Sequence, residues 1–420
     1  MLSIRSVSGE VLLATELTSF LETLAAGSHP VRALKQRLQR LCSQPRFRQR
    51  LAFLDDGIVL NDTDDEDILK PGEVQLVLLN FITASAVQIT ELRRAAERGV
   101  TARVEAILQR PQNPDLGHPA PLLVACEQGH VEVASLLLEA KADKDKATSN
   151  NATALFFAAQ KGHLEVARLL LEARADKDKA TTDRGVTPLY VAAERGQLEV
   201  VRFLLEAKAN KDHTTTDRDA TPLFVAAQNG KLEVARLLLE AKADKDKATD
   251  RGGTAFFAAA QQGHLQVARI LLAAKADMDK ATSNNATPLF IAAQRGQLEI
   301  VRLLLDARAD KDKATADREA TPLFVAAQNG QVEVVRTLLE AKADKDKATN
   351  ANVTPLFNAA ERGQWEVVQL LLNARADNDK ATTATTDREA TRLFVAAQNG
   401  QMETAGLLAK SKADKHQGAS

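Results

Sequence analysis

A pattern of hydrophobic and polar positions that returns about every 33 residues dominates the chain. The segment TPLFVAAQNG stands at 221–230 and again at 321–330, and close variants share its frame. The copies begin at positions 90, 120, 153, 187, 221, 254, 287, 321, 354 and 391. Ten copies at a nearly constant spacing predict a repeat architecture instead of one globular core.

Each copy predicts two short helices and a loop. In the copy at Thr187, this threonine suits the cap of a helix, and the proline after it suits the first helical position. Gly196 is expected to end that helix. A second helix then places Leu198, Val201 and Leu205 on one predicted apolar stripe. The polar stretch that follows predicts an extended loop, and because neither helix buries its stripe alone, neighbouring copies must stack.

This pattern resembles the ankyrin repeat, whose signature is T-P-L-H-x-A-A, then a glycine, then a second helix that ends in G-A-D. The resemblance covers roughly residues 82–415. It implies a mainly α fold, an ankyrin-repeat α-solenoid of about ten units in which the end units are degenerate. It also implies projecting fingers and a concave groove that bind partner proteins.

Two departures from the family pattern recur. The signature histidine is replaced by an aromatic residue, which gives up polar ties between repeats and gains buried apolar area, at Phe156, Tyr190, Phe224, Phe257, Phe290, Phe324, Phe357 and Phe394. The glycine that ends the second helix is replaced by a basic residue, as at Lys141, Arg174, Lys208 and Lys242. Since a left-handed cap without glycine is costly, we expect these helices to end differently.

Residues 1–81 share nothing with the repeat. MLSIRSV and EVLLATEL alternate as two strands around the turn Ser8-Gly9, and RLAFL and VQLVLLNF predict two more strands. Between them, one helical face carries Val31, Leu34, Leu38 and Leu41. This order resembles the ubiquitin-like β-grasp, a small α+β fold. We therefore expect a β-grasp domain over 1–81, the solenoid over 82–415 and a disordered tail over 416–420.

The resemblance to ubiquitin implies a small apolar docking patch, here at the matching positions Val7, Ala52 and Val77. Ala52 is smaller than the family's usual residue. Conjugation through a terminal Gly-Gly is not expected, because Phe81 leads directly into the solenoid. The β-grasp domain is thus expected to be a second docking module, with components of the ubiquitin pathway as candidate partners.

Composition excludes several classes of protein. The net charge is −1, and no basic block appears at the scale of a domain, so we expect no nucleic-acid partner. The two cysteines, Cys42 and Cys126, make neither a disulfide framework nor a metal-ligand spacing, which suits a reducing compartment. No apolar run is long enough to span a bilayer. We expect an intracellular protein, cytoplasmic or nuclear, without membrane insertion.

An acidic run suggests calcium binding, because Asp62, Asp64, Glu66 and Glu73 fall at EF-hand-like positions. Asp67 stands where that loop requires glycine, so we interpret the run as a solvated loop.

Basic residues along the first predicted helix suggest contact with RNA or a membrane. Without accompanying aromatic residues, we interpret them as a solvent-facing surface. They are Arg32, Lys35, Arg37 and Arg40, with Arg46, Arg48 and Arg50 beyond the helix.

Neither a catalytic set nor a cofactor motif emerges, so we expect no enzyme and no cofactor. His130, His163 and His264 each follow the turn glycine of a repeat and are interpreted as turn-capping residues, not metal ligands. The recurring ADKDKAT segments, balanced in charge, are interpreted as a means of keeping the solenoid soluble.

The ankyrin resemblance places binding at the finger tips and at the exposed ends of the first helices. Together these positions predict a polar rail with arginine as the main anchor, facing an extended protein surface of polar or acidic character. Three alternatives stay open: a protein-binding scaffold or adaptor, an adaptor of the ubiquitin–proteasome pathway, and an architectural solenoid without a dedicated ligand. The rail residues are Asp183, Arg184, Glu194, Arg195, Asp217, Arg218, Asp250, Arg251, Arg295, Asp317, Arg318 and Arg362.

Overall fold

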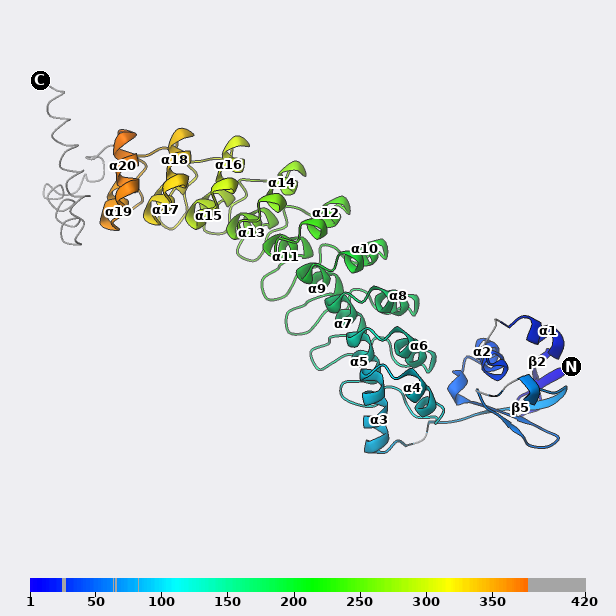
Figure 1. Cartoon of the computed structure of the whole chain (residues 1–420). Helices are drawn as coiled ribbons and strands as arrows, with labels where there is room; N and C mark the ends of the chain where they lie inside the picture. Colours follow the sequence, from blue (N-terminus) through cyan, green and yellow to red (C-terminus); the bar gives the residue numbers. More distant parts are fainter. Residues whose placement is uncertain (25–27, 63, 65, 82, 377–420) are drawn as a thin grey trace, which may run out of the picture. The chain divides into compact units, whose positions relative to one another are not determined.

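The computed structural model describes residues 1–376 except 25–27, 63, 65 and 82. The chain divides into two compact units, one of residues 1–182 and one that begins at Asp183 (Figure 1). The tenth predicted repeat, with Phe394, and the predicted tail 416–420 lie outside the described residues.

The first unit opens with a five-stranded sheet of order β2-β1-β5-β3-β4. The neighbouring strands β1 and β5 are parallel. The other three neighbouring pairs, β1–β2, β3–β5 and β3–β4, are antiparallel. This topology, with a helix over one face, is β-grasp-like, as the element order predicts. The helix α1 and the strand β4 had not been predicted. The elements are β1 (Leu2–Arg5), β2 (Val11–Thr15), α1 (Leu17–Glu22), α2 (Pro30–Cys42), η1 (Arg46–Arg48), β3 (Gln49–Phe53), β4 (Val59–Leu60), η2 (Glu66–Ile68) and β5 (Gly72–Leu78).

The core of this domain forms where α2 covers the sheet. Val31, Leu34 and Leu38 are buried there against sheet residues, as predicted. The prediction for Leu41 is wrong, since 55% of it is exposed. At 3.6 residues per turn the stripe returns at Cys42, three turns after Val31, and Cys42 packs against the core instead.

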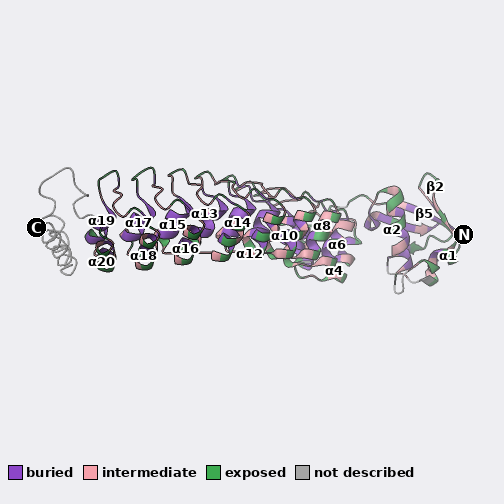
Figure 2. Cartoon of the chain, turned by 90° about the horizontal axis from the view of Figure 1, so that it is seen from above, coloured by how far each residue is buried: buried purple, intermediate pink, exposed green. Residues whose placement is uncertain are grey.

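Helix pairs follow the sheet, and first helices stack on first helices within each unit (Figure 1). In Figure 2 the first helices α13, α15 and α17 are largely buried, while second helices such as α10 and α12 show more exposed residues. The first unit contains α3 (Ala86–Glu97), α4 (Thr101–Leu108), α5 (Pro121–Gln128), α6 (Val131–Glu139), α7 (Ala154–Lys161) and α8 (Leu164–Glu172). The second contains α9 (Pro188–Arg195), α10 (Leu198–Glu206), α11 (Pro222–Gln228), α12 (Leu232–Glu240), α13 (Ala255–Gln262), α14 (Leu265–Ala273), α15 (Pro288–Arg295), α16 (Leu298–Asp306), α17 (Pro322–Gln328), α18 (Val332–Glu340), α19 (Pro355–Glu361) and α20 (Trp365–Asn373).

The first helices begin as the caps predict. The side chain of Thr221, for example, accepts a hydrogen bond from the backbone N–H of Phe224 at 3.1 Å. The first repeat differs, because α3 begins at Ala86 under a capping box of Ser85 and Gln88. The copy that the pattern starts at Thr90 therefore lies inside this helix.

The second helices bury a different stripe from the predicted one. In α10 the buried residues are Val200, Val201 and Leu204, while Leu198 and Leu205 are only half-buried. Residues at i, i+1 and i+4 share one helical face, and Leu198 and Leu205 flank it. Of the three residues predicted to form the buried stripe, only Val201 is buried.

The expectation that the second helices end differently is also wrong. Lys208 is left-handed with φ 60°, and its N–H donates to the carbonyl of Leu205 at 2.9 Å. The next N–H, of Ala209, donates to the carbonyl of Leu204 at 2.9 Å, which completes a Schellman motif. The buried Ala209 and these two bonds keep the turn in place without glycine. The same left-handed conformation recurs at Lys141, Arg174, Lys242, Lys275, Arg308, Lys342 and Arg375.

Among the aromatic replacements, Tyr190, Phe224, Phe290 and Phe324 are buried, so they do add apolar area to the core. The polar tie between repeats is not wholly lost, however. Arg218 of the next repeat donates a hydrogen bond to the Tyr190 hydroxyl at 3.1 Å.

The Lys-Asp segments do more than keep the surface charged. The backbone N–H of Asp277 donates to Oδ1 of Asp246 in the preceding repeat at 2.8 Å, and Lys280 Nζ donates to the carbonyl of Asp246 at 2.8 Å. In the same way, the backbone N–H of Asp244 donates to Oδ1 of Asp212 in the preceding repeat at 2.8 Å. These loops therefore join neighbouring repeats, a role that the sequence alone had not indicated.

The histidines also join repeats. His264 Nε2 hydrogen-bonds the carbonyl of Gln228 in the preceding repeat at 3.1 Å. Its ring lies so close to Gly230 that a Cβ there would come within 2.6 Å, which explains why that turn needs glycine. His163 makes the corresponding bond to the carbonyl of Glu127 at 3.0 Å.

Candidate functional site

The finger tips of the second unit are held at a regular spacing by backbone hydrogen bonds. The N–H of Asp250 donates to the carbonyl of Arg218 at 3.1 Å, and the N–H of Ser283 donates to the carbonyl of Arg251 at 2.9 Å. Within a tip, Asp250 Oδ1 accepts from the N–H of Arg251 at 2.8 Å. The tips therefore present their side chains from an ordered backbone.

Two of the predicted rail arginines form hydrogen bonds to side chains of neighbouring repeats. Arg184 Nε donates to Asp217 Oδ2 of the next tip at 3.1 Å, and Arg218 binds the Tyr190 hydroxyl. Burial alone would raise the pKa of Asp217, but the hydrogen bonds from Thr215 and Arg184 hold it below its ordinary value. Arg184 and Arg218 are accordingly only half-exposed; Arg184 joins two neighbouring finger tips, and Arg218 joins its finger to the first helix α9 of the preceding repeat.

The remaining rail residues are directed to the surface. Glu194, at the end of a first helix, is half-buried. The exposed members are Asp183, Asp217, Asp250, Arg251, Asp317 and Arg318 at the finger tips, and Arg195, Arg295 and Arg362 at the ends of first helices.

Hollows lie between the fingers and the first helices of the second unit. The larger, of about 610 Å³, combines the charged tips Asp217-Arg218 and Asp250-Arg251 with the rings of Phe224 and Phe257. A second hollow, of about 350 Å³, is lined by the tip Asp317-Arg318 and by the rings of Phe290 and Phe324. A third, of about 510 Å³, is lined by Glu194, Arg195, Asn229 and Lys231. The first two hollows combine apolar surface with a few polar groups, which is the usual character of a binding site, whereas polar and charged residues alone line the third.

The predicted patch of the β-grasp domain is only partly contiguous in the structure. Ala52 of β3 and Val77 of β5 are half-buried and lie on neighbouring strands, where Ala52 pairs with Gln75 and Arg50 pairs with Val77. Because side chains alternate along a strand and Leu51 and Leu76 are buried, Ala52 and Val77 share the outer face. Val7 lies in the turn between β1 and β2 and is 69% exposed.

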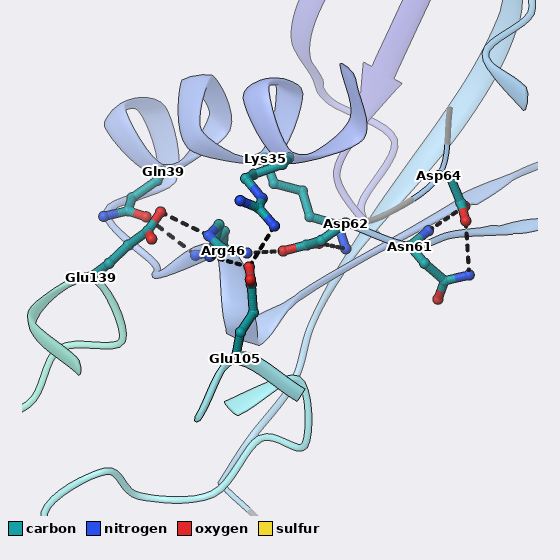
Figure 3. Close-up of polar contacts among 9 residues, drawn as sticks. Lys35, Gln39, Arg46, Asn61, Asp62, Asp64, Glu105 and Glu139 are labelled. Atoms are coloured by element: carbon teal, nitrogen blue, oxygen red, sulfur yellow. Dashed lines mark hydrogen bonds and ion pairs between the residues drawn. The ribbon is translucent and has the colours of Figure 1, made fainter. Parts of the chain in front are cut away.

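A buried polar cluster in the first unit was missed by the sequence analysis. Arg46 of η1 is 1% exposed and forms ion pairs with Asp62 of the β-grasp domain, Glu105 of α4 and Glu139 of α6 (Figure 3). The contacts to Glu105 and Glu139 measure 2.9 Å and 2.8 Å. Lys35 Nζ of α2 also binds Asp62, at 2.7 Å. This cluster holds the β-grasp domain against the second helices of the first two repeats.

Two interpretations of the sequence are therefore wrong. Asp62 is not part of a solvated loop, since it is 2% exposed. Lys35 and Arg46 do not face solvent, because they compensate the buried charge of Asp62.

A signal for this contact was present in the repeat frame. Glu105 occupies the second-helix position that carries arginine in six later repeats, and Ser135 occupies it in the second repeat. The negative charge of Glu105 is complementary to two arginines of the β-grasp domain. Glu105 forms ion pairs with Arg46 and with Arg32, the latter at 2.7 Å. The arginines at the equivalent position are Arg168, Arg202, Arg236, Arg269, Arg302 and Arg336.

We expect the stability of this contact to depend on pH. Burial alone would raise the pKa of Asp62, but the charge and hydrogen bond of Lys35, with Arg46, hold it below its ordinary value. The stabilisation is then complete above about pH 4, the ordinary pKa of aspartate, and is lost as the pH falls through the lowered value. Urea unfolding of the full chain between pH 7 and pH 2, followed in the β-grasp domain, should show this loss as a fall in the free energy of unfolding. The variant Asp62→Asn should show a flatter profile, and equal slopes in both proteins would contradict the assignment.

Two observations bear on metal binding and thiol reactivity among the residues that the structure describes. No group of three or more His, Cys, Asp or Glu side chains there is arranged to hold a metal ion. Burial raises the pKa of the Cys126 thiol, which disfavours the reactive thiolate. Among the described helices, none combines the length and apolar character needed to cross a membrane.

The repeat region matches a known family. The family model described as ankyrin repeats, in three copies, matches residues 92–181, 175–249, 241–315, 307–384 and 323–419, which together exceed half of the chain. A comparison with curated proteins found no match. Ankyrin repeats indicate a protein-interaction scaffold and are typically non-catalytic, and the chain belongs to the ankyrin-repeat family.

Proposed function

We propose that the chain is a scaffold or adaptor whose finger tips and groove hold an extended segment of a partner protein. The observation that carries this proposal is the set of hollows between fingers and first helices in the second unit. Each of the two hollows at Phe224–Phe257 and Phe290–Phe324 combines aromatic rings with charged finger tips. Such surfaces suit a partner that contributes both apolar and polar side chains.

The charges favour a partner of polar or acidic character. Arg251 and Arg318 are exposed at finger tips, and neither guanidinium forms an ion pair with another described residue. Several of the aspartates nearby are already engaged, because Asp250 and Asp317 each accept a backbone N–H of their own tip. Among the described residues, the unpaired cationic groups at these tips are the arginines, which bind carboxylates in a bidentate manner.

Reversing these charges should weaken binding strongly. We expect the full chain with Arg251→Glu and Arg318→Glu to bind its partner at least about tenfold less tightly, because like charges across an interface cost affinity. The matched control is Arg236→Glu with Arg302→Glu, which changes the net charge equally on exposed positions of second helices. Quantitative capture by wild type, test variant and control would measure the effect. If test and control variants lose the same proteins to the same extent, the finger tips do not form the site.

The main competing function is an architectural solenoid without a dedicated ligand. The near identity of several repeats is consistent with duplication for length alone. In that case wild type and test variant would capture the same background proteins. A defined protein retained by wild type and control but lost by the test variant would exclude this alternative.

The β-grasp domain is proposed as a second docking module, with ubiquitin-pathway components as candidate partners. The outer-face position of Ala52 and Val77 and the exposure of Val7 support this role. α2 and η1, in contrast, are occupied by the contact to α4 and α6. A partner of this domain therefore has the outer face of the sheet available to it.

A further inference from the structure

We propose that the groove of the second unit recognises a two-anchor motif: two apolar side chains of one extended segment, five or six residues apart, each beside an acidic residue. This inference rests on the proposed function and specifies its ligand. It is carried by the two hollows that flank the finger Thr282–Asn284, because Thr282 and Asn284 line both of them.

The two hollows share two features of their lining. Each is lined by two phenylalanine rings from the third positions of neighbouring first helices and by at least one tip arginine. The rings are Phe224 and Phe257 in the larger hollow and Phe290 and Phe324 in the smaller. A partner side chain that contacts them would be aromatic or branched and apolar.

A missing side chain contributes to the larger hollow. Gly253 lies directly before the capping threonine, where the other described fingers carry Ala152, Val186, Ala220, Ala286, Ala320 and Val353. Its backbone is not left-handed, so the conformation does not require glycine. A Cβ at this position would lie 3.3 Å from Thr249 Oγ1, 3.7 Å from Phe257 Cδ1 and 3.8 Å from Phe224 Cε2, three residues that line the hollow.

The acidic neighbours follow from the charges at the rim. Arg251 belongs to the larger hollow and Arg318 to the smaller. Arg218, which also lines the larger hollow, has a buried Nε without an acceptor among the described residues. A carboxylate beside the first anchor would supply an acceptor for the exposed guanidinium of Arg251.

The spacing of the anchors follows from the repeat geometry. The centres of the two hollows are two repeats apart, and packed helices lie about 8–10 Å apart, which gives about 16–20 Å. An extended chain advances about 3.3 Å per residue, so the anchors are about five or six residues apart.

Selection of displayed random peptides on the immobilised full chain tests the motif without a known partner. The enriched peptides should contain two aromatic or branched apolar residues at this spacing, with acidic neighbours. Gly253→Val should weaken these peptides about tenfold to a hundredfold, since it fills part of one anchor site. The matched control Ala152→Val places the same side chain at the same position of the finger Thr148–Thr153, none of whose residues lines either hollow, and it should bind as wild type does.

The outcomes separate this inference from the proposed function. Valine is the natural residue at Val186 and Val353, so Gly253→Val is compatible with the finger backbone, and thermal unfolding verifies that it folds. Gly253→Ala is the milder variant should valine impair folding. Peptides that depend on Arg251 and Arg318 but lack the paired anchors, or that bind Gly253→Val undiminished, would overturn the motif and leave the scaffold function standing. Failure to enrich any peptide that depends on the two arginines would count against both.

Discussion

Replacing Arg46 with methionine is expected to destabilise the docked β-grasp domain by about 3–5 kcal/mol. Methionine keeps much of the apolar stem but removes the charge that three carboxylates share. Of its two cations Asp62 would retain Lys35 alone, and Glu139 would lose its ion pair. Removing the cation shared by carboxylates that are 1–20% exposed costs far more stability than an exposed ion pair contributes.

Urea unfolding of the full chain, followed by hydrogen exchange in α2, α4 and α6, measures this effect. The matched control is Arg50→Met, which removes an exposed arginine from the outer face of β3 and should change stability by less than about 0.5 kcal/mol. Combining Arg46→Met with Asp62→Asn should cost less than the sum of the single changes, because both variants disrupt one network. Equal effects of Arg46→Met and Arg50→Met would show that the buried cluster does not hold the domain.

Introducing glycine at the eight left-handed basic residues that end second helices is expected to stabilise the repeats by about 4–8 kcal/mol in total. A side chain in the left-handed region costs about 1–2 kcal/mol, and the entropy of glycine offsets part of the gain, which leaves about 0.5–1 kcal/mol per site. The basic side chain itself contributes little, since Lys208 and Lys242 are exposed. In a repeat protein such local terms add up along the stack.

A stepwise series of variants, each unfolded in urea, tests the additivity. Lys245→Gly is the control for Lys242→Gly, because it lies in the same loop but not at a left-handed position, and glycine there should be neutral or destabilising. Stabilisation that does not grow with the number of glycines would mean that the left-handed turns are not strained.

The repeat architecture could be predicted because its signals are local. A threonine cap, the proline after it and the glycine that ends the helix each act within a few residues, and Thr221 and Gly196 have the predicted roles. The buried residues of α10 were harder to predict, since local periodicity alone does not decide which of several aliphatic residues face a neighbouring repeat. The left-handed Lys208 could not be predicted from propensity, because hydrogen bonds to Leu204 and Leu205 override it.

The buried ion-pair cluster around Arg46 could not be predicted from the sequence for a different reason. Arg46 and Asp62 look like surface residues when each is considered on its own segment, and only the contact with α4 and α6 buries them. The charge reversal at Glu105 was a usable signal, but it required comparison of every repeat at one position. Gly253 is similar, because its significance lies in the residues that the other fingers carry there.

The candidate site was predicted in outline only. Position in the repeat identifies the rail residues but cannot distinguish exposed Arg251 and Arg318 from Arg184 and Arg218, whose side chains bind residues of neighbouring repeats. The phenylalanine rings were assigned to the core, and their contribution to the hollows depends on how the fingers lie against the helices.

Hydrogen exchange of the full chain with and without a captured partner or selected peptide tests the central claim most directly. If the groove is the binding site, protection should increase in the fingers over residues 216–220, 249–253, 282–286 and 315–320, and in the first turns of α13, α15 and α17. The exposed faces of the second helices α12, α14 and α16 should not change. Protection confined to those second helices, or to the β-grasp sheet alone, would contradict the account.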